Sequence, residues 1–383
     1  MNSTDTLPLA GIRVIEFSHM VMGPTCGMIL ADLGAEVIKV EPPGGDKTRR
    51  LPGLGMGFFR TFNRNKKSLV LDLGKESDLA AARKLISTAD VMLENFRPGQ
   101  MARMGLGYES LNEENPRLIY AAHKGFLNGP YEHRLALDEV VQMMGGLAYM
   151  TGLPGRPLRA GASVNDIMGG MFGAMGVLAA LHERARTGRG QEIQSALYEN
   201  CALLSSQHMQ QFQMSGVPLD PMPSRASAWG VYDVFTLAGG RQLFVAAVSD
   251  KQWLTLCELL ERPDLRDDPG LRTNAQRVGC RPQLLERLGA ILREQDYDVL
   301  IRKLDKAELP YAPIQRPDQL LDDPHLIESG GLVDMQVEDG SVSKAVLLPL
   351  MMKGRRLGVQ RPIPSVGEHS EEILNTLNGI PGH

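Results

Sequence analysis

The chain has 383 residues, and 43% of them are hydrophobic, which is enough to fill the cores of two domains. Its formal net charge of −4 gives no reason to expect binding to nucleic acid or to an acidic membrane surface. The four cysteines are widely scattered without CxxC spacing, as is typical of reduced thiols in a cytosolic protein. The N-terminus lacks a basic segment followed by an apolar one, and no run of about 20 apolar residues occurs. We therefore expect no signal peptide, no membrane span and a cytoplasmic location.

The first part of the chain predicts a βαβ unit. Ile12–Phe17 has the pattern of a short strand, Pro24–Leu33 that of a helix that starts with proline after glycine, and Glu36–Val40 that of a second strand. Strands that alternate with helices are typical of a parallel sheet. We therefore expect an α/β fold whose large domain is Rossmann-like. Further elements of this domain are expected as short strands at 69–71, 91–93 and 118–121, with a helix at 77–88.

The rest of the chain predicts the end of this domain, a linker and a smaller domain. Helices at about 167–184 and 193–215 complete a large domain over 1–215. Residues 216–229 contain several prolines and no helical period, so we expect a linker there. A smaller α+β domain follows over 230–329. Its expected elements are a hairpin of 230–237 with 242–248 and helices at about 250–261, 282–295 and 297–306. Two β-like runs near 332–337 and 342–348 and a helix at about 368–377 end the chain.

Asp166 is an acidic residue at the start of an apolar segment with a regular spacing of glycines. Residues 167–181 are apolar almost throughout, which predicts a buried helix. A carboxylate at the start of such a helix lies partly out of water beside backbone N–H groups, and we expect the helix dipole to help keep it ionised. Asp166 can then serve as a nucleophile. The alternative from this pattern alone is that Asp166 is the N-cap of the helix, a common use of aspartate.

Several longer motifs occur in a fixed order along the chain. They are Leu9–Phe17, Gly23-Pro24, Leu33–Asp46, Asn65–Asp72, Asp90–Gly99, Gly129-Pro130, Asp138–Gln142, Ala180-Leu181, Thr187–Gln191 and Pro364–His369. In these motifs the chain resembles the class III CoA-transferase family, which includes formyl-CoA and crotonobetainyl-CoA transferases and the related 2-methylacyl-CoA racemases. The resemblance is densest between Leu9 and Asn200, and it places the family's aspartyl nucleophile on Asp166.

The resemblance also implies a site for coenzyme A. In the family this site has apolar walls for pantetheine and adenine, and here Phe96 is expected to cover the adenine while Arg103 pairs with phosphate. The implied CoA contacts are Met20, Val21, Met22, Leu71, Asn95, Phe96, Arg103 and Met104. Two basic residues of the family are replaced here by Pro42 and Gly74. Phosphate recognition then falls on one of Arg49, Arg50, Arg64, Lys66 or Lys75, each of which has a solvated surface cation as its alternative.

The function implied is transfer of coenzyme A from an acyl-CoA donor to a carboxylic acid, through an aspartyl anhydride and an aspartyl-CoA thioester at Asp166. Coenzyme A is the substrate, and we expect no other cofactor. No Cys/His/Asp cluster has metal-ligand spacing, so no metal is predicted. Arg159 and Arg225 are candidates to pair with the second carboxylate of a dicarboxylic acid, which favours succinyl-CoA as the donor. The resemblance further implies an interlocked homodimer and a large domain that is completed by residues 330–383.

Three other functions are weighed against this one. A nicotinamide oxidoreductase is disfavoured because the loop from Ser18 to Pro24 lacks the G-x-G-x-x-G pattern. The racemase branch carries a histidine immediately before the position of Asp138, and this chain has Leu137, which cannot carry a proton. A non-catalytic CoA-binding protein is the third alternative. His19, beside the CoA loop, and His123, after a predicted strand, are open between a substrate contact and a structural hydrogen bond.

Overall fold

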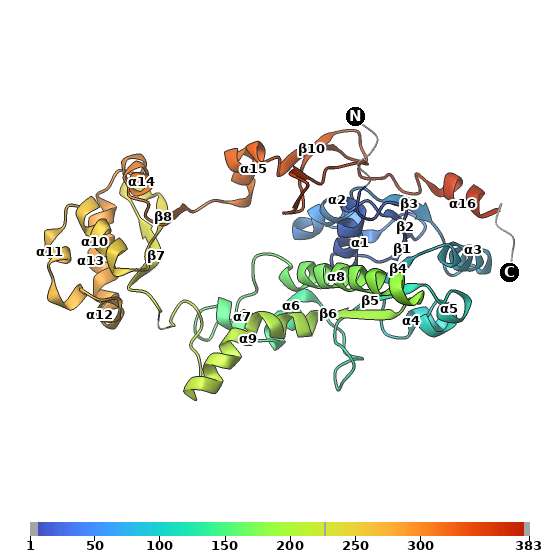
Figure 1. Ribbon diagram of the computed structural model, residues 1–383, viewed down its shortest axis with the longest axis horizontal. Helices are drawn as coiled ribbons and strands as arrows, with labels where there is room; N and C mark the ends of the chain where they lie inside the picture. Colours follow the sequence, from blue (N-terminus) through green and yellow to red (C-terminus); the bar gives the residue numbers. More distant parts are fainter. Residues whose placement is uncertain (1–6, 226, 379–383) are drawn as a thin grey trace. The chain divides into compact units, whose positions relative to one another are not determined.

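The computed structural model of this chain describes residues 7–225 and 227–378 (Figure 1). The chain forms two compact units, one of Met1–Pro223 with Pro324–His383 and one of Ser224–Asp323. The first division lies inside the expected linker 216–229. The second lies before residue 330, where the return to the large domain was expected.

The core of the first unit is a six-stranded sheet in which every neighbouring pair of strands is parallel. Its strands are β1 (Arg13–Phe17), β2 (Glu36–Glu41), β3 (Lys67–Val70), β4 (Val91–Glu94), β5 (Ile119–Lys124) and β6 (Glu192–Ala196). The spatial order is β3-β2-β1-β4-β5-β6, which is the Rossmann order. The predicted α/β fold with a Rossmann-like parallel sheet is therefore confirmed. The order of the strands reverses between β1 and β4, which is the switch point of the sheet.

Strand β6 was not predicted from the sequence. The expected helix at 193–215 begins only with α9 (Leu197–Ser215), and the residues before it pair in parallel with β5, with Ala121 opposite Ile193. The segment is short, half polar and runs into the helix without a glycine or proline between them. Its backbone N–H and C=O groups find partners on β5 only after the chain has folded, so local pattern could not reveal this strand.

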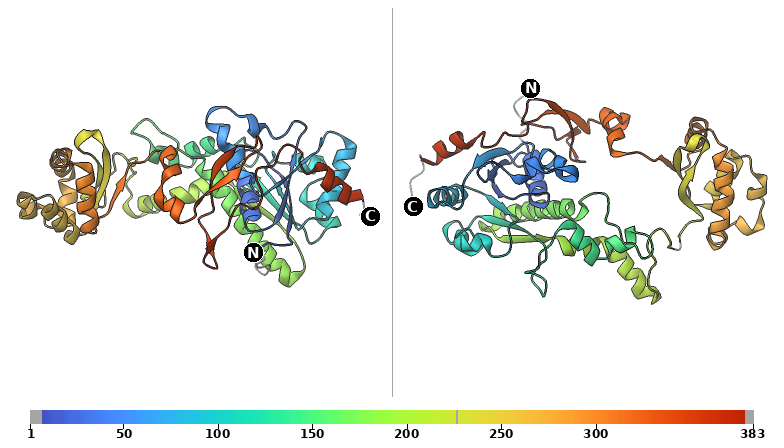
Figure 2. Two further views of the ribbon diagram at one scale, coloured as in Figure 1. Left: turned by 90° about the horizontal axis from the view of Figure 1, so that it is seen from above. Right: turned by 180° about the vertical axis from the view of Figure 1, so that it is seen from behind.

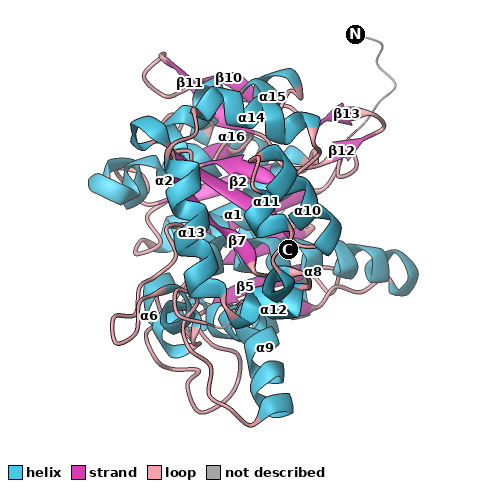
Figure 3. Ribbon diagram, turned by 90° about the vertical axis from the view of Figure 1, so that its left-hand side faces the viewer, coloured by secondary structure: helices cyan, strands magenta, loops and turns pink. Residues whose placement is uncertain are grey.

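Helices cover both faces of the sheet. Figure 3 draws the helices in cyan and the strands in magenta. Side chains of successive residues point to opposite faces, so Val14 packs with Leu30 and Val177 whereas Ile15 packs with Leu85. The first face is covered by α1 (Met22–Asp32) and α8 (Val164–Thr187). The second face is covered by α3 (Glu76–Ser87), α5 (Tyr108–Glu114) and α16 (Ser370–Asn378). Shorter helices are α2 (Phe58–Phe62), α4 (Gln100–Arg103), α6 (Asp138–Met144) and α7 (Leu147–Thr151).

Helix α8 packs closely against α1 through its glycines. A Cβ atom at Gly170 would lie 2.5 Å from Thr25 Cβ and 2.6 Å from the Met22 carbonyl oxygen, so only glycine lets the two backbones approach this far. By length and composition alone, α8 is the one helix in the described part of the chain that could cross a membrane. In the first unit it instead packs against α1, β5 and β6.

The C-terminal segment belongs to the first unit. It contains α15 (Pro324–Glu328), the antiparallel pair β10 (Leu332–Gln336) and β11 (Val342–Val346), and the short strands β12 (Met351–Met352) and β13 (Arg355–Arg356). Met335 and Ala345 of the antiparallel pair pack with Phe59 of α2. Helix α16, near the C-terminus in Figure 2, contacts α3 and β3. Residues from opposite ends of the sequence therefore share one core.

The second unit is a small α+β domain. Its sheet has the order β7 (Val231–Thr236), β8 (Gln242–Ala247) and β9 (Tyr311–Pro313), with antiparallel neighbours. The predicted hairpin is present, and its turn uses left-handed backbone at Gly239 and Gly240. Trp253 is fully buried in the core. The helices are α10 (Asp250–Leu259), α11 (Pro263–Arg266), α12 (Asn274–Gly279), α13 (Arg281–Arg293) and α14 (Tyr297–Lys306).

Candidate active site

A cavity of about 670 Å³ opens at the carboxyl ends of β1, β2, β3 and β4. Its lining includes Phe17 at the end of β1, Glu41 at the end of β2, Leu71 just after β3 and Phe96 just after β4. In open parallel sheets, ligands bind outside the carboxyl ends of the strands, where the strand order reverses. Because this sheet reverses between β1 and β4, the cavity lies where a ligand is expected.

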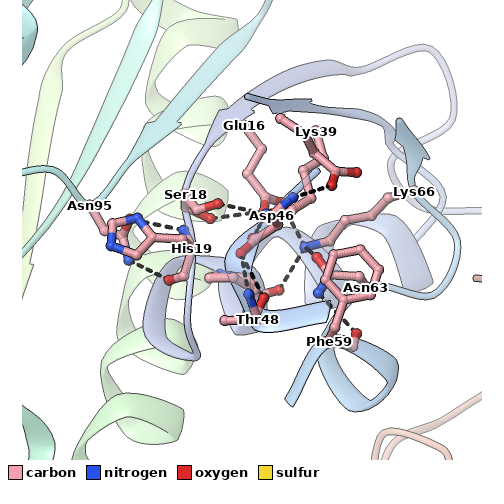
Figure 4. Close-up of polar contacts among 12 residues, drawn as sticks. Glu16, Ser18, His19, Lys39, Asp46, Thr48, Phe59, Asn63, Lys66 and Asn95 are labelled. Atoms are coloured by element: carbon pink, nitrogen blue, oxygen red, sulfur yellow. Dashed lines mark hydrogen bonds and ion pairs between the residues drawn. The ribbon is translucent and has the colours of Figure 1, made fainter. Parts of the chain in front are cut away.

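The loop after β1 is fastened to the end of β4 across this switch point. The backbone N–H of His19 donates to Asn95 Oδ1 at 3.0 Å, and Asn95 Nδ2 donates to the His19 carbonyl oxygen at 2.7 Å (Figure 4). The next residue, Met20, has left-handed backbone with φ of 65°, which is unusual for a residue with a side chain. The two hydrogen bonds therefore fix a loop conformation that its sequence alone does not favour.

A network of buried charged side chains also holds the loop after β1 in place. Lys39 Nζ donates to the Ser18 carbonyl oxygen at 2.5 Å and lies 3.0 Å from Asp46 Oδ2 and 3.4 Å from Glu16 Oε1. The other oxygen of Glu16 lies 2.7 Å from Lys66 Nζ, and burial lowers the pKa of Lys66 to about 8 although Glu16 opposes this shift. Both lysines are fully buried. Buried charges stay ionised only when they are paired, so this network fixes the relative positions of β1, β2 and the loop.

Three of the five candidate phosphate-binding cations form ion pairs inside the protein and are not available to a ligand. Lys66 is paired with Glu16 as described. Arg49 Nη2 lies 2.6 Å from Glu41 Oε1, and Arg64 Nη2 lies 2.6 Å from Asp32 Oδ2. All three basic side chains are at least nine-tenths buried. All three lie in sequence segments that the family resemblance assigns to the CoA site, but each one neutralises a buried carboxylate of the protein itself.

The other two candidates remain at the surface. Lys75 is exposed and lies 3.8 Å from Asp72, a residue of the cavity lining. Arg50 is exposed and donates to the Gly44 carbonyl oxygen at 2.7 Å. Neither side chain lines the cavity.

Half of the implied CoA contacts line the cavity directly. These are Met20, Leu71, Phe96 and Met104. They come from four segments, after β1, β3, β4 and α4, so the fold brings them together from positions far apart in the sequence. Their side chains give the cavity an apolar wall, which is the surface that pantetheine or adenine requires.

The remaining implied contacts lie elsewhere. Val21 and Met22 are buried in the core behind the loop, and Asn95 holds the loop through the His19 backbone. Arg103 is exposed, and its guanidinium lies beside Gly99. The described geometry thus gives Val21, Met22 and Asn95 a part in shaping the cavity wall, and it does not place Arg103 in the lining.

Asp166 is the third residue of α8, and the N-cap of this helix is Ser163. The alternative that Asp166 caps the helix is therefore wrong. The end of the helix is held instead by Asp138, whose Oδ2 accepts the backbone N–H of Asn165 at 2.8 Å and that of Asp166 at 3.1 Å. Because Asp138 occupies the positive end of the helix, the expectation that the helix dipole keeps Asp166 ionised needs correction.

The surroundings of Asp166 favour its protonated form. Burial and, as a smaller effect, the negative charge of Asp138 together raise the pKa of Asp166 to about 7, against the opposing effect of Arg159. A carboxyl group whose pKa lies near neutrality is poised between a protonated acid and a carboxylate nucleophile.

Arg159 contributes an unused hydrogen-bond donor beside this pair. Gln142 Nε2 donates to Asp138 Oδ1 at 2.5 Å, and Gln142 Oε1 accepts the Ala160 N–H at 2.8 Å, which ties the segment before α8 to α6. Arg159 Nη2 lies 3.7 Å from Asp138 Oδ1 and is buried without a hydrogen-bond partner. A buried guanidinium N–H normally has an acceptor, so the group is suited to a ligand oxygen.

Packing connects Asp166 to the loop after β1, although Asp166 does not line the cavity. The next residue, Ile167, packs against the cluster that contains Val21. One turn further on, Gly170 touches the backbone of Met22. The aspartate and the cavity wall are therefore parts of one packed arrangement of α1 and α8.

The comparisons with known proteins fit this geometry. The sequence model of CoA-transferase family III matches residues 9–370. The chain belongs to this family. The succinate–glutarate CoA-transferase of Agrobacterium fabrum is 36% identical over 97% of this chain and 96% of that protein. The succinyl-CoA:mesaconate CoA-transferase of Haloarcula hispanica is 34% identical over 96% of each chain. The crystal structure of a CAIB/BAIF family protein from Brucella suis superposes with a TM-score of 0.87 at 32% identity, covering 97% of this chain and 100% of that chain.

The protein is thus a family III CoA-transferase. The two histidines considered as substrate contacts, His19 and His123, lie in different surroundings. His123 is buried, its Nδ1 lies 3.3 Å from the Glu94 carbonyl oxygen, and its ring packs against Gly173, two turns along α8 from Asp166. Burial lowers the pKa of His123 to about 4. His123 does not line the cavity, and its Nε2 is buried without a hydrogen-bond partner among the described residues. His19 lines the cavity, where its ring faces Phe96 with centroids 5.8 Å apart.

Two features of this CoA-transferase were missed from the sequence. Glu16 and Lys39 are charged residues with apolar neighbours on both sides within β1 and β2, and they lie directly opposite each other in the β1–β2 register. Opposite charges at such positions are a signal for a buried pair that could have been read. Asp138, which caps α8, lies 28 residues before Asp166 in the sequence, so no local sequence pattern reveals this contact. Among the residues that the structure describes, no group of His, Cys, Asp or Glu could hold a metal ion.

Proposed function

We propose that this family III CoA-transferase moves coenzyme A from succinyl-CoA to a carboxylic acid through covalent intermediates on Asp166. The observation that carries the proposal is the half-buried carboxyl of Asp166, whose pKa is raised to about 7 at the start of a helix packed on the cavity loop. A carboxylate in such surroundings is poorly solvated and therefore more nucleophilic than one in water.

The reaction follows from what this carboxylate does with a thioester. Asp166 attacks the succinyl-CoA carbonyl, forming a mixed anhydride and releasing the CoA thiolate. The thiolate attacks the aspartyl carbonyl of the anhydride, which forms an aspartyl-CoA thioester and releases succinate. An acceptor carboxylate then attacks this thioester, and the returning thiolate attacks the acyl carbonyl of the new anhydride. The products are the acceptor's CoA thioester and free Asp166, so the thioester bond is conserved.

The choice of succinyl-CoA rests on two observations. Relatives that match nearly the whole chain are named as enzymes of succinate or succinyl-CoA. Arg159 offers a buried, unpartnered N–H beside the carboxyl pair, which suits the free carboxylate of a dicarboxylic acyl group. Arg225, the other candidate, belongs to the second unit.

The enzyme is proposed to act as a homodimer in the cytoplasm, without a membrane, nucleic acid or any cofactor beyond coenzyme A. Large apolar side chains are exposed along α8 and α9, and a second copy of the chain would cover them. They include Met171, Met175, Leu203, Met209 and Met214. A stable monomer at micromolar concentration in sedimentation velocity would contradict the dimer.

The test of the activity is a panel of carboxylic acids offered with succinyl-CoA, acetyl-CoA or formyl-CoA as donors. We expect transfer with succinyl-CoA and at least one acid, and a much lower rate for donors without a second carboxylate. Incubation of a 2-methylacyl-CoA in deuterated water tests the racemase alternative, which Leu137 disfavours because it cannot move a proton. Exchange of the α-hydrogen without transfer would establish the racemase, and CoA binding without either reaction would establish a binding protein.

A further inference from the structure

The cavity at the switch point contains a single Lys or Arg side chain among its described lining residues, that of Lys47. Coenzyme A carries a diphosphate and a 3′-phosphate, and a site for it needs positive charge near at least one of them. The other ionisable lining residues are His19, Glu41, Asp46 and Asp72.

Two of these carboxylates are already neutralised by partners. Glu41 forms the ion pair with Arg49 and accepts the Ser68 hydroxyl at 2.7 Å. Asp46 lies 3.0 Å from Lys39 and accepts the backbone N–H of Thr48 at 2.9 Å. Their negative charges are therefore balanced beneath the cavity wall, and the charge of Lys47 is left to act on a ligand.

Lys47 stands on a rigid support. It begins a single 3₁₀ turn, Lys47–Arg50, whose N-cap is Asp46. Two residues on, the Arg49 guanidinium lies 3.7 Å from the centre of the Phe59 ring, which anchors the other end of the turn. The neighbours of Lys47 are buried, whereas its own side chain is exposed and forms no ion pair within the described ranges 7–225 and 227–378. An ammonium group without an ion-pair partner, carried by a well-anchored backbone turn, is suited to bind a phosphate.

Lys47 and His19 both line the cavity, and the charge of Lys47 reaches the imidazole. Burial is the main cause that lowers the pKa of His19, Asp46 opposes the shift, and the charges of Lys39 and Lys47 add to it. Lys47 therefore acts on the imidazole that lines the same cavity.

We propose that Lys47 binds a phosphate group of coenzyme A in this enzyme. It would supply the charge that the resemblance expects from the positions of Pro42 and Gly74, neither of which can carry one. This inference rests on the proposed function, because it takes the cavity to be the CoA site.

The experiment is calorimetric titration of the full-length protein with coenzyme A and with 3′-dephospho-CoA. The wild type is compared with Lys47→Met, with the charge-preserving Lys47→Arg and with Lys251→Met, an exposed lysine of α10 in the second unit. Loss of a charged hydrogen bond to phosphate is expected to weaken CoA binding by about tenfold to hundredfold in Lys47→Met. Lys47→Arg should recover most of this loss, and Lys251→Met should bind as the wild type does.

The two ligands identify the phosphate. If Lys47 binds the 3′-phosphate, Lys47→Met and the wild type will bind 3′-dephospho-CoA equally. If it binds the diphosphate, both ligands will weaken by the same factor. In either case KM for succinyl-CoA should rise while kcat stays near its wild-type value, since Lys47 does not touch the reacting carbonyl.

A Lys47→Met protein that binds coenzyme A within about twofold of the wild type would overturn the inference and leave the proposed function standing. A wild type that binds no coenzyme A and transfers none would overturn both. Because Lys47 is exposed, the melting temperature of Lys47→Met should equal that of the wild type, so a folding defect is easily recognised.

Discussion

Asp138 holds the backbone of Asp166: its Oδ2 accepts the Asp166 N–H at 3.1 Å and that of the preceding residue at 2.8 Å. One carboxylate thus fixes the helix start that carries the other, and its negative charge also raises the pKa of the second. Position and protonation of the proposed nucleophile therefore depend on the same neighbour. This dependence has consequences that pH and mutation experiments can measure.

Transfer activity is expected to rise with pH around neutrality. The reacting form of Asp166 is the carboxylate, and its pKa is raised to about 7, so about a tenth is ionised at pH 6 and about nine tenths at pH 8. The profile of kcat/KM against pH measures this midpoint. Asp138→Asn should move the midpoint to lower pH because it removes a negative neighbour, and Arg159→Met should move it to higher pH. A profile that is flat from pH 5 to 8 would contradict this account.

Asp166→Asn is expected to abolish transfer and to stabilise the protein above neutral pH. The folded pKa of about 7 lies above the ordinary value of 3.8, so the stability due to this group is complete below about pH 4 and is lost as pH rises through 7. Asparagine has no such dependence. The melting temperature of the variant should therefore exceed that of the wild type more at pH 8 than at pH 5. An equal difference at both values would show that the Asp166 pKa is not raised.

Gly170→Ala is expected to destabilise the protein, because the added Cβ would lie 2.6 Å from the Met22 carbonyl oxygen and 2.5 Å from Thr25 Cβ. Overpacking of this kind costs about 1–3 kcal/mol. The matched control is Gly289→Ala in α13, where a Cβ meets no atom within 4 Å and helix propensity favours alanine by about 1 kcal/mol. Urea unfolding of both variants checks the difference. Similar stabilities would mean that α1 and α8 move apart without cost.

Lys66→Met is expected to cost about 3–5 kcal/mol of unfolding free energy, since it leaves one oxygen of the buried Glu16 carboxylate without its partner. The control is Lys75→Met, because the Lys75 side chain is 68% exposed and its Nζ lies 3.8 Å from Asp72 Oδ2. Exposed pairs contribute under about 1 kcal/mol. Guanidinium unfolding of the two variants compares the costs, and equal losses would argue against a supporting role for the buried network.

The parallel sheet was predictable from the sequence because most of its first five strands are short runs rich in apolar residues between helices or turns. The switch point also follows once the Rossmann order is assumed. Strand β6 could not be predicted, since Glu192–Ala196 gains its strand character from pairing with β5. Local sequence pattern predicts a strand only where the apolar residues of the strand themselves mark its buried face.

Charges were harder to assign than apolar residues. Arg49, Arg64 and Lys66 occur in the segments that the resemblance assigns to coenzyme A, yet each one neutralises a buried carboxylate. A cation's partner is set by tertiary packing, so sequence position cannot distinguish a ligand contact from an internal ion pair. For the same reason, the effect of the α8 dipole on Asp166 could not be predicted. The backbone N–H groups at the start of the helix donate to Asp138, which lies 28 residues earlier in the chain.

The most direct test of the central claim is covalent trapping. The enzyme is mixed with succinyl-CoA in the absence of an acceptor, quenched with hydroxylamine and digested for mass spectrometry, with Asp166→Asn as the control. Our account predicts a hydroxamate on the peptide that contains Asp166, no modification of Asp138, and no adduct in the variant. Transfer by Asp166→Asn at more than about a hundredth of the wild-type rate, or an adduct at another residue, would contradict it.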